Sequence, residues 1–280
     1  MNAIEIKALE KNYPGFGLKL DLALPQGSIM GLIGENGAGK TTAIKLILGM
    51  TKPDGGRIEV LGRPVDKNFA RVREEIGVVL DEPAFPDCLK AGQVDKIMRN
   101  IYKNWDSAAF RDNLAKLSVP DDKPFKDFSR GMKMKLSIAV ALAHRPRLLV
   151  LDEPTSGLDP LVRDQVVDIF SEFTRDEGHS VLISSHIVSD LEKLCDYVAF
   201  LHKGRLLLCQ EKDRLMEEYG IAHCAAGELA ALDSAAVLGR RDSAYGVSAI
   251  VRRDAAPAGM ALSTVGIEEL FVFMVKEEER

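Results

Sequence analysis

The chain has 280 residues, of which 46% are hydrophobic and 28% charged, and its formal net charge is −5. This composition is typical of a globular protein with a sizeable core and excludes a disordered or fibrous chain, while the acidic balance speaks against a broad basic surface, so no nucleic-acid partner is expected. No apolar run reaches the roughly 18 residues that span a bilayer, and the N-terminus lacks a secretory pattern, so a cytosolic chain is predicted. The four cysteines show no C-x-x-C spacing, which predicts neither a zinc site nor a disulfide framework.

The first 60 residues contain stretches of alternating apolar and polar side chains, which predict half-buried strands. The alternation covers residues 4–9 and 18–24. The turn at 25–27 leads into an apolar run at 29–33, and a second turn precedes a strand at 57–62. We therefore expect an N-terminal antiparallel β subdomain.

A phosphate-binding loop follows the apolar run. Residues 34–41 fit G-x-x-x-x-G-K-[ST] between an expected strand and an expected helix from Lys40 to about Gly49, which is the context that this motif needs. The glycines let backbone N–H groups surround a phosphate, and the helix N-terminus adds positive dipole. A plain Gly-rich turn would explain the glycines but not Lys40, which would bridge the outer phosphates, or Thr41, whose hydroxyl would bind Mg²⁺. The residues expected to contact the nucleotide are Gly34, Glu35, Asn36, Gly37, Ala38, Gly39, Lys40, Thr41 and Thr42.

The middle of the chain predicts a sheet interrupted by helices. Apolar residues recur at helical spacing between about 85 and 145, which indicates a helical insertion. Continuous apolar strands at 76–80, 148–151 and 181–185 alternate with helices, as in a sheet covered on both faces. A hairpin at 197–208 closes this part, and the chain then becomes weakly patterned. The predicted fold class is α/β, a phosphate-loop NTPase with a mixed sheet core, an ATPase domain over 1–220 and a small C-terminal subdomain over 221–280.

Two carboxylates, Asp152 and Glu153, end the strand at 148–151, where ligands of open α/β sheets collect. Asp152 would hold Mg²⁺, directly or through water, and Glu153 would polarise the water that attacks the γ-phosphate. Phosphoryl transfer needs positioning and charge neutralisation more than covalent chemistry, so Glu153 and Lys40 are candidate catalytic residues. An isolated acidic pair is usually solvated or caps a helix, but downstream of a phosphate loop it indicates a nucleotide hydrolase.

From about Tyr13 to Arg205, the order of these motifs resembles the nucleotide-binding subunit of ATP-binding-cassette (ABC) transporters. The resemblance implies that His186 is a switch histidine, which contacts the γ-phosphate and orients Glu153 or the water. A lone histidine at a strand end is more often structural. Tyr13 stands where an aromatic residue stacks on adenine in that family, although a plain strand-end tyrosine would fit as well.

The resemblance extends to two motifs that serve a second subunit. Residues 128–133, Phe-Ser-Arg-Gly-Met-Lys, stand where the family has its signature, usually Leu-Ser-Gly-Gly-Gln, and residues 156–159, Ser-Gly-Leu-Asp, resemble its D-loop. Ser129 is a natural N-cap whose hydroxyl could face an anion, though as an isolated pattern it would be a helix cap only. The family pairs two cassettes head to tail, so Ser129, Gly131 and Asp159 are expected at a shared ATP site of a homodimer or of two paralogous cassettes.

Three residues depart from the family's usual pattern. Arg130 and Met132 replace residues of the signature, and Asp81 stands where a glutamine senses Mg²⁺ and the attacking water. An ionised carboxylate donates no hydrogen bond but attracts Mg²⁺ more strongly. Asp81 is therefore either a metal or water contact with altered coupling, or a turn residue before Pro83. Several sequences resembling bacterial ABC exporter subunits carry an acidic residue there together with a basic one in the signature.

The resemblance implies a transporter motor with ATP and Mg²⁺ as cofactors. It would act at the cytoplasmic face of the cell membrane, bound to an integral membrane permease, and export is expected by resemblance to exporter ATPases. An apolar surface at residues 82–89 could receive a helix of the permease, or could be a buried loop. The alternative is a soluble ABC ATPase acting on the ribosome or DNA, but such proteins usually have two cassettes or a long coiled coil. A small GTPase is excluded because no Asn-Lys-x-Asp motif is present.

Overall fold

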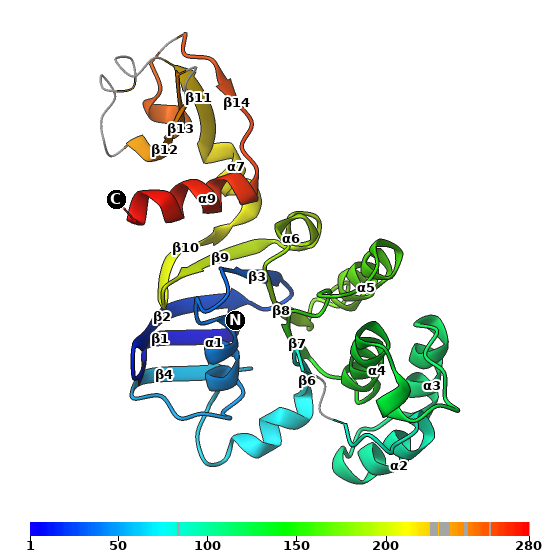
Figure 1. Cartoon of the computed structure of the whole chain (residues 1–280). Coiled ribbons are helices and arrows are strands. Elements are labelled where there is room, and N and C mark those ends of the chain that lie inside the picture. The colour runs from blue at the N-terminus through cyan, green and yellow to red at the C-terminus, as the bar shows by residue number, and fades with distance from the viewer. Residues whose placement is uncertain (83–84, 225–228, 230–235, 244–245, 258, 280) are drawn as a thin grey trace.

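The computed structural model describes residues 1–82, 85–224, 229, 236–243, 246–257 and 259–279. Within them the chain forms a ten-stranded sheet and a separate four-stranded sheet (Figure 1). The strand order of the large sheet is β5-β4-β1-β2-β10-β9-β3-β8-β7-β6. Its strands are β1 (Asn2–Tyr13), β2 (Phe16–Pro25), β3 (Ile29–Ile33), β4 (Gly55–Val60), β5 (Arg63–Pro64), β6 (Ile76–Val79), β7 (Leu148–Asp152), β8 (Ser180–Ser185), β9 (Tyr197–His202) and β10 (Arg205–Glu211).

The large sheet is mixed, as predicted. β9, β3, β8, β7 and β6 are mutually parallel, whereas β1 pairs antiparallel with β2 and with β4. The N-terminal strands belong to the same sheet because β2 pairs with β10 at Lys19 and Arg205. A side chain at Gly204 would collide with the carbonyl of Gly17, so glycine is required where the two parts of the sheet join.

Helices cover both faces of the parallel strands, and the two faces contribute to separate hydrophobic clusters. Met30 and Leu32 of β3 face the cluster that holds α1 (Lys40–Ile47) and the antiparallel strands. Ile29 and Ile33 face the cluster that holds α5 (Pro160–Phe173) and α6 (Val188–Leu194). This alternation follows from the period of two in a strand and explains why the strands read as continuous apolar runs.

The inserted region consists of α2 (Ala91–Ile101), α3 (Ser107–Lys116) and α4 (Arg130–Ala143), with a short 3₁₀ helix at Phe125–Asp127, while another 3₁₀ helix at Phe69–Glu75 precedes β6. These three helices lie together beside the β6 edge of the sheet (Figure 1). In the expected apolar docking surface, Phe85 packs edge-on against Phe125 with ring centroids 5.6 Å apart, and Pro83 and Ala84 lie outside the described residues. Phe85 is therefore partly used for internal packing.

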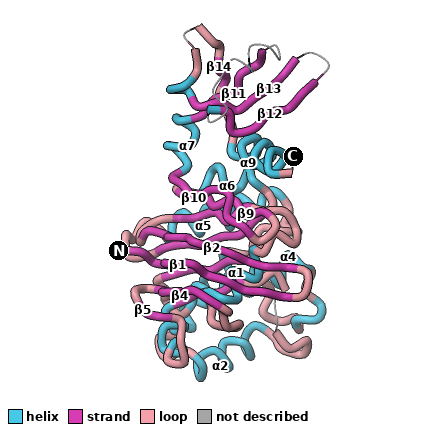
Figure 2. The backbone as a smooth tube through the Cα atoms, turned by 90° about the vertical axis from the view of Figure 1, so that its left-hand side faces the viewer, coloured by secondary structure: helices cyan, strands magenta, loops and turns pink. Residues whose placement is uncertain are grey.

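The C-terminal part begins with α7 (Lys212–Glu218) and forms the small sheet from β11 (Tyr219–Cys224), β12 (Val237–Ser243), β13 (Gly246–Arg252) and β14 (Leu262–Ser263). A last helix, α9 (Ile267–Glu278), lies between the two sheets (Figures 1 and 2). Phe271 of α9 packs against Phe200 of β9 with ring centroids 5.5 Å apart, so both parts share one hydrophobic cluster. None of the described helices is long and apolar enough to cross a membrane.

Candidate active site

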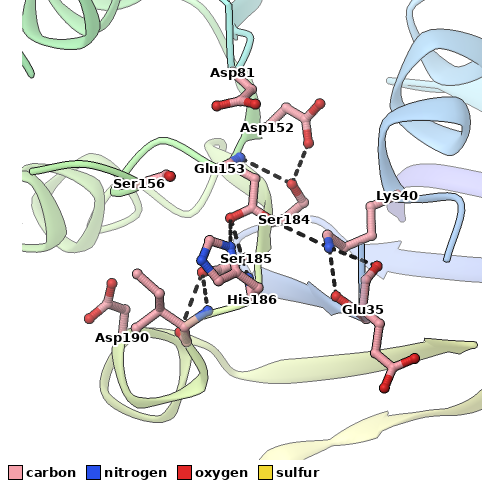
Figure 3. A network of polar contacts seen from close by, with 12 residues as sticks. Glu35, Lys40, Asp81, Asp152, Glu153, Ser156, Ser184, Ser185, His186 and Asp190 are labelled. Carbon is pink, nitrogen blue, oxygen red and sulfur yellow. Dashed lines mark hydrogen bonds and ion pairs between the residues drawn. The ribbon is translucent and has the colours of Figure 1, made fainter. Parts of the chain in front are cut away.

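Candidate functional side chains gather where four neighbouring strands end. β3, β8, β7 and β6 are adjacent and parallel, so their carboxyl ends lie at one edge of the sheet. β3 leads into the 34–39 loop, and β8 is followed by His186. β7 ends at Asp152 with Glu153 directly after it, and β6 is followed by Asp81 (Figure 3). The sheet thus brings together motifs that are far apart in the sequence, at the edge where ligands of open α/β sheets bind.

The phosphate loop connects β3 to α1 in the predicted strand–loop–helix context. A Cβ atom at Gly34 would lie 2.5 Å from the carbonyl oxygen of Leu201, and Gly39 caps the helix at φ 112°, so both positions need glycine. The Lys40 ammonium donates to the carbonyl oxygens of Gly34 at 2.6 Å and Glu35 at 3.3 Å, and the residue is only 6% exposed. An ammonium held among oxygen atoms at a helix N-terminus is suited to a phosphate.

Asp152 is held by hydroxyl groups on both of its oxygens. Thr41 Oγ1 donates to one carboxylate oxygen at 2.7 Å and Ser184 Oγ donates to the other at 2.6 Å. Ser184 also accepts a hydrogen bond from the Glu153 backbone N–H at 3.1 Å. Asp152 is 1% exposed, and a buried carboxylate needs such partners. Sequence reasoning missed Ser184, although a polar residue at the end of an otherwise apolar strand was a usable signal.

Glu153 joins the phosphate loop to the candidate switch histidine. One of its carboxylate oxygens lies 3.3 Å from Lys40 Nζ, and the other accepts from His186 Nδ1 at 2.6 Å. The Glu153 backbone has φ 52°, a left-handed conformation that costs free energy for a residue other than glycine and tends to occur at functional sites. The fold therefore places Lys40, Glu153 and His186 in one polar network (Figure 3).

A cavity of about 330 Å³ lies over this network. Its lining includes the phosphate loop, Thr41, Asp81 and Glu153, and also Phe16. The Phe16 ring packs against Gly39, where a Cβ atom would be 3.0 Å from Cζ. Tyr13 is 42% exposed, pairs with Phe16 across the β1–β2 hairpin, and is not part of the described lining. The sequence indicated an aromatic residue in this hairpin, but missed Phe16.

The signature and D-loop residues contact each other outside that lining. Ser129 is the N-cap of α4 and accepts from the Met132 N–H at 3.2 Å, and Asp159 caps α5 by accepting from the Val162 N–H at 3.1 Å. Gly131 lies against Leu158, since a Cβ atom there would be 3.3 Å from its side chain. The described cavity lining includes neither Ser129 nor Asp159.

The departures at positions 81 and 130 meet in space. Arg130 Nη2 donates to Asp81 Oδ1 at 2.6 Å and to Ser156 Oγ at 3.3 Å. This contact joins the end of β6, the start of α4 and the D-loop. Neither Asp81 nor Arg130 was predicted to have the other as its partner.

The residues present fit a magnesium nucleotide better than a metal held by protein alone. Among the described residues no group of three histidine, cysteine or acidic side chains could hold a metal ion. The Thr41 hydroxyl and the Asp152 carboxylate are adjacent oxygen donors. Mg²⁺ is typically bound by one or two such groups together with substrate phosphates and waters.

The sheet topology and the phosphate loop facing an acidic pair define a phosphate-loop nucleoside triphosphatase. The sequence profile described as ABC transporter matches residues 18–156. A bacitracin transport ATP-binding protein of Enterococcus faecalis is 33% identical over 73% of this chain and 68% of its own length. A lantibiotic transport ATP-binding protein of Streptococcus pyogenes is 35% identical over 75% of this chain and 91% of its own length.

The fold agrees with these sequence matches. A solved ATP-binding subunit of an ABC transporter superposes with a TM-score of 0.69 and 28% identity, over 76% of this chain and 91% of that one. The chain belongs to the ATP-binding subunits of ABC transporters, which are nucleotide-binding ATPases. The predicted family and fold class are thereby confirmed.

Proposed function

We propose that this subunit hydrolyses magnesium-bound ATP at the cavity over Lys40 and Glu153. The observation that carries the proposal is the network at the four strand ends, in which Glu153 Oε2 accepts from His186 and Oε1 faces the Lys40 ammonium. Lys40 and the N–H groups of residues 34–42 bind and orient the phosphates. Thr41 and Asp152 would hold Mg²⁺, which supplies charge neutralisation at the phosphates when bound.

In this mechanism Glu153 is the group that orients and deprotonates water. Its carboxylate is fixed on both oxygens, so little reorganisation is needed when the water is positioned. The Nδ1–H of His186 donates to Glu153 and keeps the carboxylate aimed at the cavity. Asp81 lines the same cavity, although Arg130 already binds one of its carboxylate oxygens. Tyr13 and Phe16, at the end of one hairpin, are the aromatic candidates for contact with the base.

We further propose that the complete site forms between two copies of this chain or with a paralogous cassette. Ser129, Gly131 and Asp159 are nucleotide contacts by family resemblance, yet they lie outside the described lining of the chain's own cavity. The positive end of the α4 dipole at Ser129 and its hydroxyl suit a phosphate of the partner's ATP. In this arrangement residues 1–220 are the ATPase domain, with the helical subdomain at about 85–145, and residues 221–280 are an appendage.

As an ABC transporter subunit, the dimer would drive a separate integral membrane permease at the cytoplasmic face of the membrane. The two relatives described above carry names that refer to transport of bacitracin and of lantibiotics, and we propose export as the direction of transport here. The permease determines substrate selectivity in this scheme.

The experiment that tests the shared site uses Glu153→Gln, which keeps the side-chain shape while removing the base. Size-exclusion chromatography with light scattering should show a dimer with ATP and a monomer with ADP or without nucleotide. A monomer at saturating ATP would contradict the shared site. Purification from native membranes should recover a polytopic membrane protein with the chain. Recovery with ribosomes instead would overturn the transporter assignment.

A further inference from the structure

The Asp81–Arg130 pair connects a residue of the cavity lining to the start of the signature helix and to the D-loop. Arg130 is the first residue of α4, directly after the N-cap Ser129. Its Nη2 donates to Asp81, which follows β6, and to Ser156 in the D-loop. One guanidinium therefore joins the start of the signature helix to a cavity residue and to the D-loop.

Packing directs Arg130 to this position. Gly157 has φ 74°, and a Cβ atom there would lie 3.3 Å from Arg130 Cδ and 3.5 Å from its Nε. The stem of the arginine thus lies across the glycine, in space that a side chain would fill. Gly131 makes a similar close contact with Leu158. The signature and the D-loop touch at two successive positions, with Arg130 at the end nearer the cavity.

The D-loop contact leads directly to the candidate base. The Ser156 N–H donates to the Glu153 carbonyl oxygen at 3.1 Å, closing the turn that follows β7. Through its hydrogen bond to Ser156, Arg130 therefore contacts the turn that runs from Glu153 to Ser156. The other partner, Asp81, lines the cavity together with Lys40, Thr41 and Glu153.

We propose that Arg130 is a positioning residue for hydrolysis and that Asp81 and Arg130 act as a matched pair. Arg130 orients Asp81 and the Glu153–Ser156 turn relative to the phosphate loop, which makes the departures at 81 and 130 a single coupled exchange. The pair contributes little to stability because the two side chains are 45% and 56% exposed and water and salt screen such pairs. Its effect is on the geometry of the chemical step.

The test is a double-mutant cycle with Arg130→Gly, Asp81→Gln and the double variant, which restores the residue types usual at both positions. The inference rests on the proposed function, and wild-type hydrolysis together with ATP-dependent dimerisation checks that function independently. We expect each single variant to lower kcat about tenfold with the KM for ATP changed less than about twofold. The double variant should recover to within about threefold of wild type, because neither partner is then left unpaired.

A second readout separates pairing from a general structural role. Salt screens an exposed ion pair, so kcat of the wild type should fall more steeply between about 0.05 and 0.5 M salt than kcat of the double variant. Arg145→Gly is the matched control, because Arg145 forms an exposed pair with Asp106 at 2.8 Å in the inserted helical region. It should leave kcat and its salt dependence at wild-type values.

Three outcomes would overturn the proposal. One is multiplication of the two single effects in the double variant, which would show that the residues act independently. Another is wild-type kcat in both single variants. The third is the same salt dependence of kcat in the wild type and the double variant. If the wild-type protein showed no ATP hydrolysis, that result would instead contradict the proposed function.

Discussion

The phosphate-loop side and the signature side of the site differ in how far the chain itself determines their geometry. Lys40 and Glu153 have side chains only 6% and 12% exposed, and each has more than one polar partner. On the signature side Arg130 is 56% exposed, and Ser129 binds one N–H of its own helix. The first side is preorganised within one subunit, whereas in the proposed shared site the second presents its groups to a partner. Variants on the two sides should therefore fail at different stages of the ATP cycle.

The largest effect is expected for Glu153→Gln on the preorganised side. Loss of a general base lowers kcat by about 10²–10⁴-fold, while the Lys40 contacts that bind phosphate remain. Steady-state phosphate release measures kcat, and equilibrium binding of a fluorescent ATP analogue serves as the control. A kcat within about threefold of wild type would show that another group is the base.

Lys40→Ala should act one stage earlier, on binding. Removing the ammonium costs the charge-assisted hydrogen bonds to phosphate, each worth about 1.5–3 kcal/mol, so ATP affinity of the monomer should fall about 10- to 100-fold. Isothermal titration calorimetry at low protein concentration measures this affinity. Arg145→Ala provides a control of the same charge change. An unchanged dissociation constant would contradict the role of the loop.

Ser129→Ala should leave ATP binding by the monomer unchanged and weaken the dimer instead. The partner's phosphate loses one hydrogen bond at this position, which corresponds to about tenfold weaker ATP-dependent dimerisation. The lost N-cap also costs about 1 kcal/mol of stability, so Asp106→Ala, which removes the N-cap of α3 away from the site, serves as the control for that loss. Sedimentation equilibrium of both variants in the Glu153→Gln background measures the difference. Equal dimerisation would place Ser129 outside the shared site.

The smallest effect concerns stability away from both sides of the site. Burial lowers the pKa of His144, whose Nε2 lies 3.1 Å from the Ile76 carbonyl oxygen. The unfolded chain therefore binds this proton more readily than the folded protein. The contribution of His144 is complete above about pH 7, begins to be lost as pH falls below about 6.5, and is fully lost only below the lower folded-state pKa. Urea unfolding at pH 7.5 and 5.5 should show this decrease, and His144→Phe should reduce it.

Features that depend on neighbouring residues were predictable from the sequence. The phosphate loop requires glycines, a lysine and a threonine at fixed spacing between a strand and a helix, and the structure has β3 and α1 there. Asp152 and Glu153 follow an apolar run and lie at the expected strand end. Ser129 and Asp159 cap the helices that they precede. In each case the physical cause acts over a few residues.

Features that depend on tertiary contacts were not predictable from the sequence. Asp81 and Arg130 meet only because β6 and α4 are placed together by the sheet and the inserted helices. Phe16 enters the cavity lining because of how the β1–β2 hairpin lies against Gly39. The N-terminal strands join the parallel strands through β2 and β10, a pairing that leaves no trace in the local pattern. These contacts arise from the arrangement of whole elements.

The contact between Phe200 and Phe271 has a consequence for the synthesis and aggregation of the protein in the cell. The small sheet is separate in its hydrogen bonding, yet α9 completes the apolar covering of β9 and α6. During synthesis, a nascent chain of which only the first 220 residues have left the ribosome therefore lacks α9, and the apolar surface of β9 and α6 that α9 covers stays exposed. Such uncovered apolar surface is what chaperones bind and what leads to aggregation. Completion of the core must wait for the final helix, so a cut near residue 218 would separate two halves of one packing unit.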